Sequence, residues 1–345
     1  YFDNLIKGAS LGSGLQSALE AAISRLPIPK VMSYQLEADC ALPGWSSVNF
    51  VRPAHRLIAL HGDQVVPVNA LGLRSGNLTQ GHRFEAAFDP VMIQHADQYV
   101  QALERDGAVI PSYASRSLNM IRQLREKAKT CGARLEIENN LDGMSEADIE
   151  ATLLDDPLVQ EVTALVERPN VLVCRFDPQF LEVPQECLIL TMKANQKYFP
   201  LLDQNGKLTH QFLVVGVTAP KDPSAVVGGN ERVVRPRLAD AKFFFDQDRK
   251  RSLESRVNGL SKVVYHNKLG SQGERMHRVV LIAKAIADAL VQSGDQAYAN
   301  PSAEWTNQIE TAARLAKTDL LTDMVGEFPE LQGIMGAYYA RHDGL

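Results

Sequence analysis

The chain has 345 residues, enough for two to three domains and a sizeable hydrophobic core. Hydrophobic residues make up 45% of it and charged residues 22%, as in an ordinary soluble globular protein. The net charge of −5 excludes a globally basic nucleic-acid binder, so any RNA contact requires a local basic patch.

The cysteines give no sign of a metal or redox motif. Cys40, Cys131, Cys174 and Cys187 are widely spaced and form no C-x-x-C pair. The last two lie in apolar runs, so we expect buried thiols in a reducing compartment. We find neither a membrane-length apolar run nor a signal-peptide pattern. Because the sequence starts at Tyr1 and stops just past an apparent helix, we expect a fragment of a longer protein.

The first predicted elements are a helix and a set of short strands. Apolar residues at helical spacing predict a helix over residues 13–26. Two apolar runs, Leu57–Leu60 and Val65–Leu73, flank a turn at Gly62-Asp63 and predict strands. Five basic side chains are expected near these strand ends or loops: Arg52, Arg56, Arg74, His82 and Arg83. They form either the solvated rim of a sheet or a set of phosphate contacts.

The middle of the chain mixes helices and strands without strict alternation, which favours an α+β class for residues 30–220. Helices are predicted over residues 95–105, 115–129, 145–154 and 157–166, and strands over 133–137 and 171–176. Ser145 is the expected N-cap of the third helix. The basic residues of the second helix form either a solvated face or an RNA-facing stripe: Arg116, Arg122, Arg125, Lys127 and Lys129.

The stretch Leu190–Arg251 organises the rest of the chain. Its first half predicts a β-hairpin, with strands over residues 198–202 and 211–217 and a type I′ turn at Asn205-Gly206. Gly228-Gly229-Asn230 then predicts a turn, followed by a helix that starts at Asn230 or at Pro236. The spacing of four apolar residues places them on one face of that helix: Val234, Leu238, Ala241 and Phe245.

Residues 257–345 contain no convincing strand pattern. Helices are predicted over residues 276–290, 305–322 and 331–340, with a loop over 294–301. We therefore predict three parts: residues 1–29 as an N-terminal helical segment, 30–255 as an α+β body, and 256–345 as the start of a helical domain.

A basic cluster lies at the centre of the chain. Arg232, Arg235 and Arg237 fall within six residues, with Lys193 and Lys197 on the segment before them. Such a cluster suits phosphate, and a helix N-terminus would add backbone donors. The alternative is pairing within the chain to three nearby carboxylates: Asp240, Asp246 and Asp248. The aromatic run Phe243–Phe245 is assigned mainly to the core, with base stacking by one ring as the alternative.

Other catalytic patterns are missing. None of the short glycine clusters is a nucleotide-binding loop, and no G-x-S-x-G nucleophile motif occurs. Glu327-Phe328-Pro329-Glu330 is interpreted as a helix-breaking loop rather than a catalytic carboxylate pair.

Three long segments carry a resemblance to a known family. MKANQKYFPLLDQNGKL, GNERVVRPRLADAKFFFDQDRK and MVGEFPELQGIMGAYYARHDG resemble the β subunit of the bacterial heterotetrameric glycyl-tRNA synthetase. Shorter segments add to the resemblance, namely LPIPKVM, FVRPAH and GHRF. It runs from about Leu26 to the end of the sequence.

The resemblance implies a fold and a role. The α+β body would be similar to the editing-type domain of the phenylalanyl-tRNA synthetase β subunit, followed by an all-helical HD-like domain. The protein would be a cytoplasmic subunit of a glycine–tRNA ligase with two α and two β chains. The α subunit would carry catalysis with ATP and Mg, and this chain would bind and orient tRNA-Gly. An anticodon-binding domain would lie beyond Leu345.

We accordingly expect no catalytic residue, metal site or cofactor in this chain. Seven residues are predicted from charge and placement to contact tRNA: Arg74, Arg83, Lys193, Lys197, Arg232, Arg235 and Arg237.

Two alternative functions remain. His277, Asp319, His342 and Asp343 suggest a metal-dependent phosphohydrolase of the HD type. Lys317-Thr318 stands where its adjacent His-Asp pair is expected, which favours a helical scaffold without that chemistry. The other alternative is a free-standing RNA-binding or deacylating module.

Overall fold

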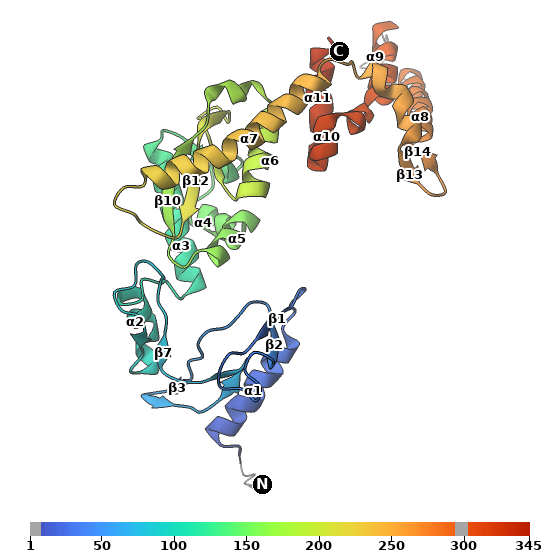
Figure 1. Cartoon of the computed structure of the whole chain (residues 1–345). Helices are drawn as coiled ribbons and strands as arrows, with labels where there is room; N and C mark the ends of the chain where they lie inside the picture. The colour runs from blue at the N-terminus through green and yellow to red at the C-terminus, as the bar shows by residue number, and fades with distance from the viewer. Residues whose placement is uncertain (1–7, 294–302) are drawn as a thin grey trace, which may run out of the picture. The chain divides into compact units, whose positions relative to one another are not determined.

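The computed structural model describes residues 8–293 and 303–345, which form two compact units (Figure 1). The first contains the chain up to Gln123, together with Glu150–Asn170 and Val215–Pro220. The second contains Leu124–Ile149, Val171–Val214 and Lys221–Leu345. The domain boundaries predicted near residues 29 and 255 stay predictions, and the loop predicted over 294–301 lies outside the described residues. No helix in the described ranges is long and apolar enough to cross a membrane.

The first unit is built from short antiparallel hairpins. They pair β1 (Met32–Gln35) with β2 (Ser47–Phe50), β3 (Leu60–His61) with β4 (Gln64–Val65), β5 (Asn69–Ala70) with β6 (Leu73–Arg74), and β7 (Leu78–Thr79) with β8 (Val91–Met92). The predicted strand over Val65–Leu73 is wrong in its length. Leu71 and Gly72 take positive φ angles of 53° and 76° and reverse the chain inside that run.

Helices complete the first unit. They are α1 (Leu11–Arg25), α2 (Tyr99–Arg105) after the short 3₁₀ turn η1 (Ala96–Gln98), α5 (Pro157–Leu165), and parts of α3 (Tyr113–Thr130) and α4 (Glu146–Asp155). Ser145 caps α4 as predicted, because its hydroxyl accepts the Asp148 N–H at 3.2 Å. A small core forms where Val91, Ile93 and Ala102 pack with Ile58 and Leu60.

The second unit contains a four-stranded sheet of order β10-β12-β11-β9. Its strands are β10 (Asn170–Arg175), β12 (Leu208–Gly216), β11 (Phe199–Leu202) and β9 (Arg134–Leu135). The predicted hairpin is confirmed, with Phe199 opposite Leu213. The predicted type I′ turn is wrong. Such a turn needs a positive φ at both central residues, and only Gly206 has one, of 75°. The strand predicted over residues 133–137 is shorter than expected, since the 3₁₀ turn η2 (Glu136–Glu138) follows β9 directly.

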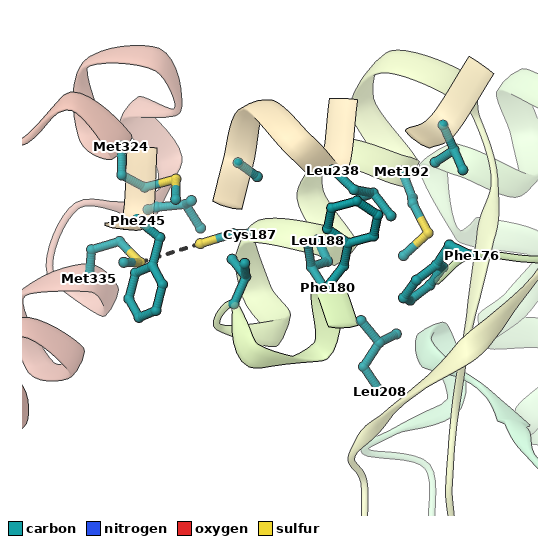
Figure 2. Packing of buried hydrophobic residues seen from close by; sticks show 14 of the residues in the cluster. Phe176, Phe180, Cys187, Leu188, Met192, Leu208, Leu238, Phe245, Met324 and Met335 are labelled. Atoms are coloured by element: carbon teal, nitrogen blue, oxygen red, sulfur yellow. Dashed lines mark hydrogen bonds between the residues drawn. The ribbon is translucent and has the colours of Figure 1, made fainter. Parts of the chain in front are cut away.

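Two helices share a core with this sheet, α6 (Gln185–Gln196) and α7 (Ser224–Asp248). Leu190–Gln196 therefore belongs to α6 and not to the predicted hairpin. The 3₁₀ turn η3 (Pro178–Glu182) precedes α6. Figure 2 shows Phe180, Leu188 and Leu238 meeting in this core. The predicted buried face of α7 is confirmed for all of its members: Val234, Leu238, Ala241 and Phe245.

Both predicted buried thiols lie in this core. Cys174 and Cys187 are fully buried, and the Cys187 sulfur lies 3.3 Å from the Met335 sulfur (Figure 2). Burial raises the pKa of each thiol to about 12. Both side chains therefore stay protonated and pack as small apolar groups.

Helix α7 runs without a break through Gly228-Gly229-Asn230 and Pro236, so both predicted helix starts are wrong. The Asn230 side chain donates to the Val226 carbonyl at 2.8 Å and accepts the Tyr198 hydroxyl at 2.8 Å. These bonds fix Asn230 inside the helix and tie it to the sheet side of the core. Packing of the buried face outweighs the weak helix preference of the two glycines.

The C-terminal part of the second unit is mostly helical. It comprises η4 (Glu254–Lys262), α8 (Gln272–Gln292), α9 (Ala303–Leu315), η5 (Thr318–Leu321), α10 (Asp323–Glu327), η6 (Pro329–Leu331) and α11 (Ile334–His342). The expectation of no strand here is wrong. A hairpin pairs β13 (Val264–His266) with β14 (Gly270–Ser271), and Gly270 supplies the positive φ of 84°.

Candidate nucleic-acid interface

Three of the predicted contact residues lie on the exposed side of α7. Arg232, Arg235 and Arg237 are all exposed, and none forms a hydrogen bond or ion pair with another described residue. At about 100° per residue, Arg232 and Arg235 lie about 60° apart around the helix. Arg237 lies about 140° from Arg232 and projects from a different side. The structure therefore brings two of the three together.

The alternative prediction, that these arginines pair with nearby carboxylates, is wrong. Asp246 contacts Lys242 at 3.3 Å and Arg249 at 2.5 Å. Asp248 is buried and contacts Arg256 at 3.2 Å. Two of the three candidate carboxylates thus pair with other cations, and Asp240 has no ion pair with these arginines. The positive charge of Arg232 and Arg235 faces solvent.

The predicted support from a helix N-terminus is also wrong. Helix α7 begins at Ser224, two turns before Arg232. The backbone N–H groups beside Arg232 and Arg235 lie inside the helix and are used by its own carbonyls. Near the real start, the Asp222 carboxylate already accepts the Ser224 N–H at 3.0 Å. Any anion would therefore be held by side chains alone.

An aromatic ring shares the arginine face. Phe243 is 56% exposed, although its run was assigned mainly to the core. Phe245 meets that assignment, since it is buried against Tyr339 with ring centroids 5.9 Å apart. Phe243 is eleven residues after Arg232 and therefore only about 20° from it around the helix. One face of α7 thus combines two free guanidinium groups with an exposed phenyl ring.

The two predicted lysines are engaged within the chain. The Lys193 ammonium contacts the Glu136 carboxylate at 2.5 Å, which compensates its charge. Lys197 ends α6 in a left-handed conformation with φ of 58°, and its backbone N–H donates to the Lys193 carbonyl. Both side chains are half-buried. They are less available to a phosphate than the arginines of α7.

In the first unit, the basic residues of the GHRF segment differ in environment. His82 is 3% exposed, its Nε2 lies 2.6 Å from the Val217 carbonyl, and its Nδ1 accepts the Glu85 N–H. His82 is thus part of the fold and is closed to phosphate. Arg83 is exposed and lies 5.6 Å from the centroid of the Phe84 ring.

Arg74 ends β6, is exposed, and lines a cavity together with Arg56 and His55.

Asp319 and Asp343, two of the residues that suggested a phosphohydrolase, form hydrogen bonds to the backbone. The buried Asp319 carboxylate accepts the Gly333 and Gly336 N–H groups at the start of α11. Asp343 accepts the Leu253 N–H at 2.7 Å, and His277 is exposed on α8. No three His, Cys, Asp or Glu side chains within residues 8–293 and 303–345 are grouped to hold a metal ion.

Comparison with known proteins assigns the chain. A family model described as the glycyl-tRNA synthetase beta subunit matches residues 1–345. The chain belongs to this family. It is 63% identical to the glycine–tRNA ligase beta subunit of Polaromonas naphthalenivorans over 344 residues, and 62% identical to that of Dechloromonas aromatica over 345 residues. Each match covers the whole of this chain and 45% of the relative. The chain therefore spans about half the length of these relatives.

The three long family segments of this beta-subunit chain map to the second unit. MKANQKYFPLLDQNGKL covers the end of α6 and strand β11, GNERVVRPRLADAKFFFDQDRK covers most of α7, and MVGEFPELQGIMGAYYARHDG covers α10 and α11. All three contribute to one hydrophobic core, which continues past residue 255. The similarity predicted to the phenylalanyl-tRNA synthetase editing-type domain and to HD domains stays a prediction.

Proposed function

We propose that this chain is part of the tRNA-binding β subunit of a glycine–tRNA ligase. A separate α subunit would join glycine to tRNA-Gly with ATP and Mg, and two chains of each kind would form the enzyme. Membership of the beta-subunit family along all 345 residues carries the proposal. This chain would bind and orient tRNA. The phosphohydrolase alternative lacks support, because Asp319 and Asp343 accept the Gly333 and Leu253 backbone N–H groups.

Within this role, the exposed face of α7 is the best-supported tRNA contact in the second unit. Arg232 and Arg235 have no internal partner among the described residues, and guanidinium groups bind phosphate through two parallel hydrogen bonds. Phe243 lies on the same face and can stack on an unpaired base. Free cations beside an exposed ring are what a nucleic-acid surface requires, and an ordinary solvated helix face has no need of the ring.

Charge reversal tests this surface. In the full-length subunit with its α partner, Arg232→Glu with Arg235→Glu should weaken tRNA-Gly binding roughly tenfold at moderate salt. Because each phosphate contact releases counterions, the slope of log K against log salt should fall in magnitude by about 1.5. Filter binding or fluorescence anisotropy across a salt series measures both quantities.

The matched control changes the same charge elsewhere on the same segment. Lys250→Glu with Arg251→Glu alters two exposed cations just past the end of α7 and should leave the salt slope nearly unchanged. Equal slopes for the native protein and the α7 double variant would remove α7 from the interface.

A further inference from the structure

A second cationic site lies in the first unit, which contains none of the three long family segments. A cavity of about 250 Å³ is lined by His55, Arg56 and Arg74, together with backbone and apolar groups between them. All three side chains are exposed, and none has a hydrogen-bond or ion-pair partner among the described residues. Asp39 is the one acidic residue in the lining. The cavity therefore carries an excess of uncompensated donors.

The backbone explains why residues so far apart in sequence line one cavity. The Gly76 N–H donates to the Leu57 carbonyl at 2.9 Å, and Ile58 forms a parallel bridge with Gly76. This pairing places the segment after Arg56 beside the segment after Arg74. The two arginines are thus held on neighbouring backbones by hydrogen bonds that do not involve their side chains.

A buried serine fixes the backbone that carries Arg74. The Ser75 hydroxyl donates to the Val66 carbonyl at 2.7 Å and accepts the Val68 N–H at 2.9 Å. Ser75 is 9% exposed, so these bonds are shielded from water. The backbone position of Arg74 is therefore set before any ligand arrives, which lowers the part of the entropy cost of binding that comes from ordering the backbone.

The loop between β1 and β2 borders the same cavity. A Cβ atom on Gly72 would lie 2.5 Å from the Leu36 side chain, so only glycine lets Leu36 pack on this turn. Leu36 begins the loop, and Asp39 within it lines the cavity. The loop is closed by bonds from the Gly44 N–H to the Leu36 carbonyl and from the Trp45 N–H to the Leu42 carbonyl.

The same loop presents an indole ring to solvent. Trp45 is 84% exposed, the largest exposed fraction among the large hydrophobic residues described as exposed. A tryptophan in that state gains nothing from burial in this chain. Trp45 lies six residues after Asp39 in the loop that borders the cavity. Proteins use exposed aromatic side chains together with cationic grooves to stack unpaired bases.

We propose that this part of the first unit binds a single-stranded segment of RNA. A backbone phosphate enters the cavity between Arg56, Arg74 and His55, and a neighbouring base stacks on Trp45. The inference rests on the proposed function for the identity of the RNA, which is then an unpaired segment of tRNA. Three free donors against one carboxylate favour a phosphate ligand over an acidic or apolar protein surface, since the cavity supplies charge and the ring supplies stacking.

Fluorescence of Trp45 tests the proposal directly. The sequence contains two tryptophans, Trp45 and Trp305. In the full-length subunit with its α partner, Trp305 and any other tryptophan outside these residues are replaced by phenylalanine, so that emission reports Trp45. Titration with tRNA-Gly should quench this emission, with a midpoint equal to the dissociation constant measured by anisotropy. A short single-stranded oligonucleotide should quench it as well, at higher concentration.

Variants separate the two parts of the site. Arg56→Glu with Arg74→Glu should weaken binding of the oligonucleotide by at least tenfold and abolish the quenching of Trp45 emission. Trp45→Ala should weaken binding of the oligonucleotide about fivefold or more. The thermal unfolding midpoint should stay unchanged, because the ring is exposed. Arg105→Glu is the control, since that arginine is also exposed in the first unit but is already paired with Asp106.

The outcomes are distinguishable from failure of the proposed function. Suppose that tRNA binds and that the α7 double variant weakens this binding. If tRNA then leaves Trp45 emission unchanged and the Arg56/Arg74 variant binds as tightly as the native protein, the first-unit site is wrong while the proposed function stands. Weaker Trp45 emission in the complex with the α subunit than in the β subunit alone, before RNA is added, would identify a protein-docking surface and overturn the inference. Equal quenching by a mononucleotide and by the oligonucleotide would replace the RNA with a free nucleotide and overturn it too.

Discussion

Asp248 joins several elements of the second unit through one buried carboxylate. Its buried carboxylate accepts the Asp323 and Met324 N–H groups at 2.8 and 2.9 Å and the Tyr339 hydroxyl at 2.9 Å. Arg256 contacts it at 3.2 Å and also donates to its backbone carbonyl. Burial and this carboxylate raise the pKa of Tyr339, so its hydroxyl remains a donor. One side chain therefore joins the end of α7 to η4, α10 and α11.

Removing that charge should destabilise the protein strongly. Asp248→Asn replaces one acceptor oxygen by an amide donor and leaves Arg256 buried without a counterion. The free energy of unfolding should therefore fall by about 3–5 kcal/mol. Asp246→Asn is the matched control, because Asp246 is two residues away, more exposed, and paired only at the surface. Urea unfolding of both variants measures the difference. Equal effects would show that the buried network does not hold the helices together.

These pairings show why sequence alone could not decide between phosphate contact and internal pairing for the arginines of α7. Proximity in the chain pointed to Asp246 and Asp248 as partners for the arginines of α7. The actual partner of Asp248 is Arg256, in a 3₁₀ segment after the helix ends. Ion pairing is decided by the direction of side chains and by burial, which depend on how α7 packs. The positions of Arg232 and Arg235 were predictable from sequence, and their freedom from internal partners was not.

At the scale of elements, α7 tests how packing overrides local preference. A Cβ built on Gly229 meets no atom within 4 Å, so Gly229→Ala should stabilise the helix by about 0.5–1 kcal/mol. Gly206→Ala should instead destabilise the hairpin by about 1–2 kcal/mol, because Gly206 has a φ of 75°. Thermal unfolding compares the two. A destabilising Gly229→Ala would indicate that the helix requires glycine for close approach to a partner.

Periodic elements were predictable, and short or interrupted ones were not. The apolar spacing of four, three and four residues located the buried face of α7. Helix α6 was missed because its continuous apolar run, Cys187–Leu190, carries no helical period and continues into the hairpin sequence. The hairpin of β13 and β14 was missed because strands of three and two residues leave almost no pattern.

At the scale of the whole molecule, sequence supplied the family and structure supplied the candidate contacts. The three family segments were recognisable because they are long and lie in one core. The cavity at His55, Arg56 and Arg74 could not be found in the same way, because it depends on a bridge between Ile58 and Gly76, eighteen residues apart. His55 and Arg56 were therefore absent from the seven predicted tRNA contacts, although Arg74 was among them.

Under the proposed function, this chain would belong to a subunit that supports a separate catalytic chain in charging tRNA-Gly. Aminoacylation of tRNA-Gly with glycine and ATP should be measured for the α subunit alone, the full-length β subunit alone, and the two combined. We predict full activity only for the combination. Charging by the β subunit alone, or equal charging by the α subunit with and without it, would contradict the claim.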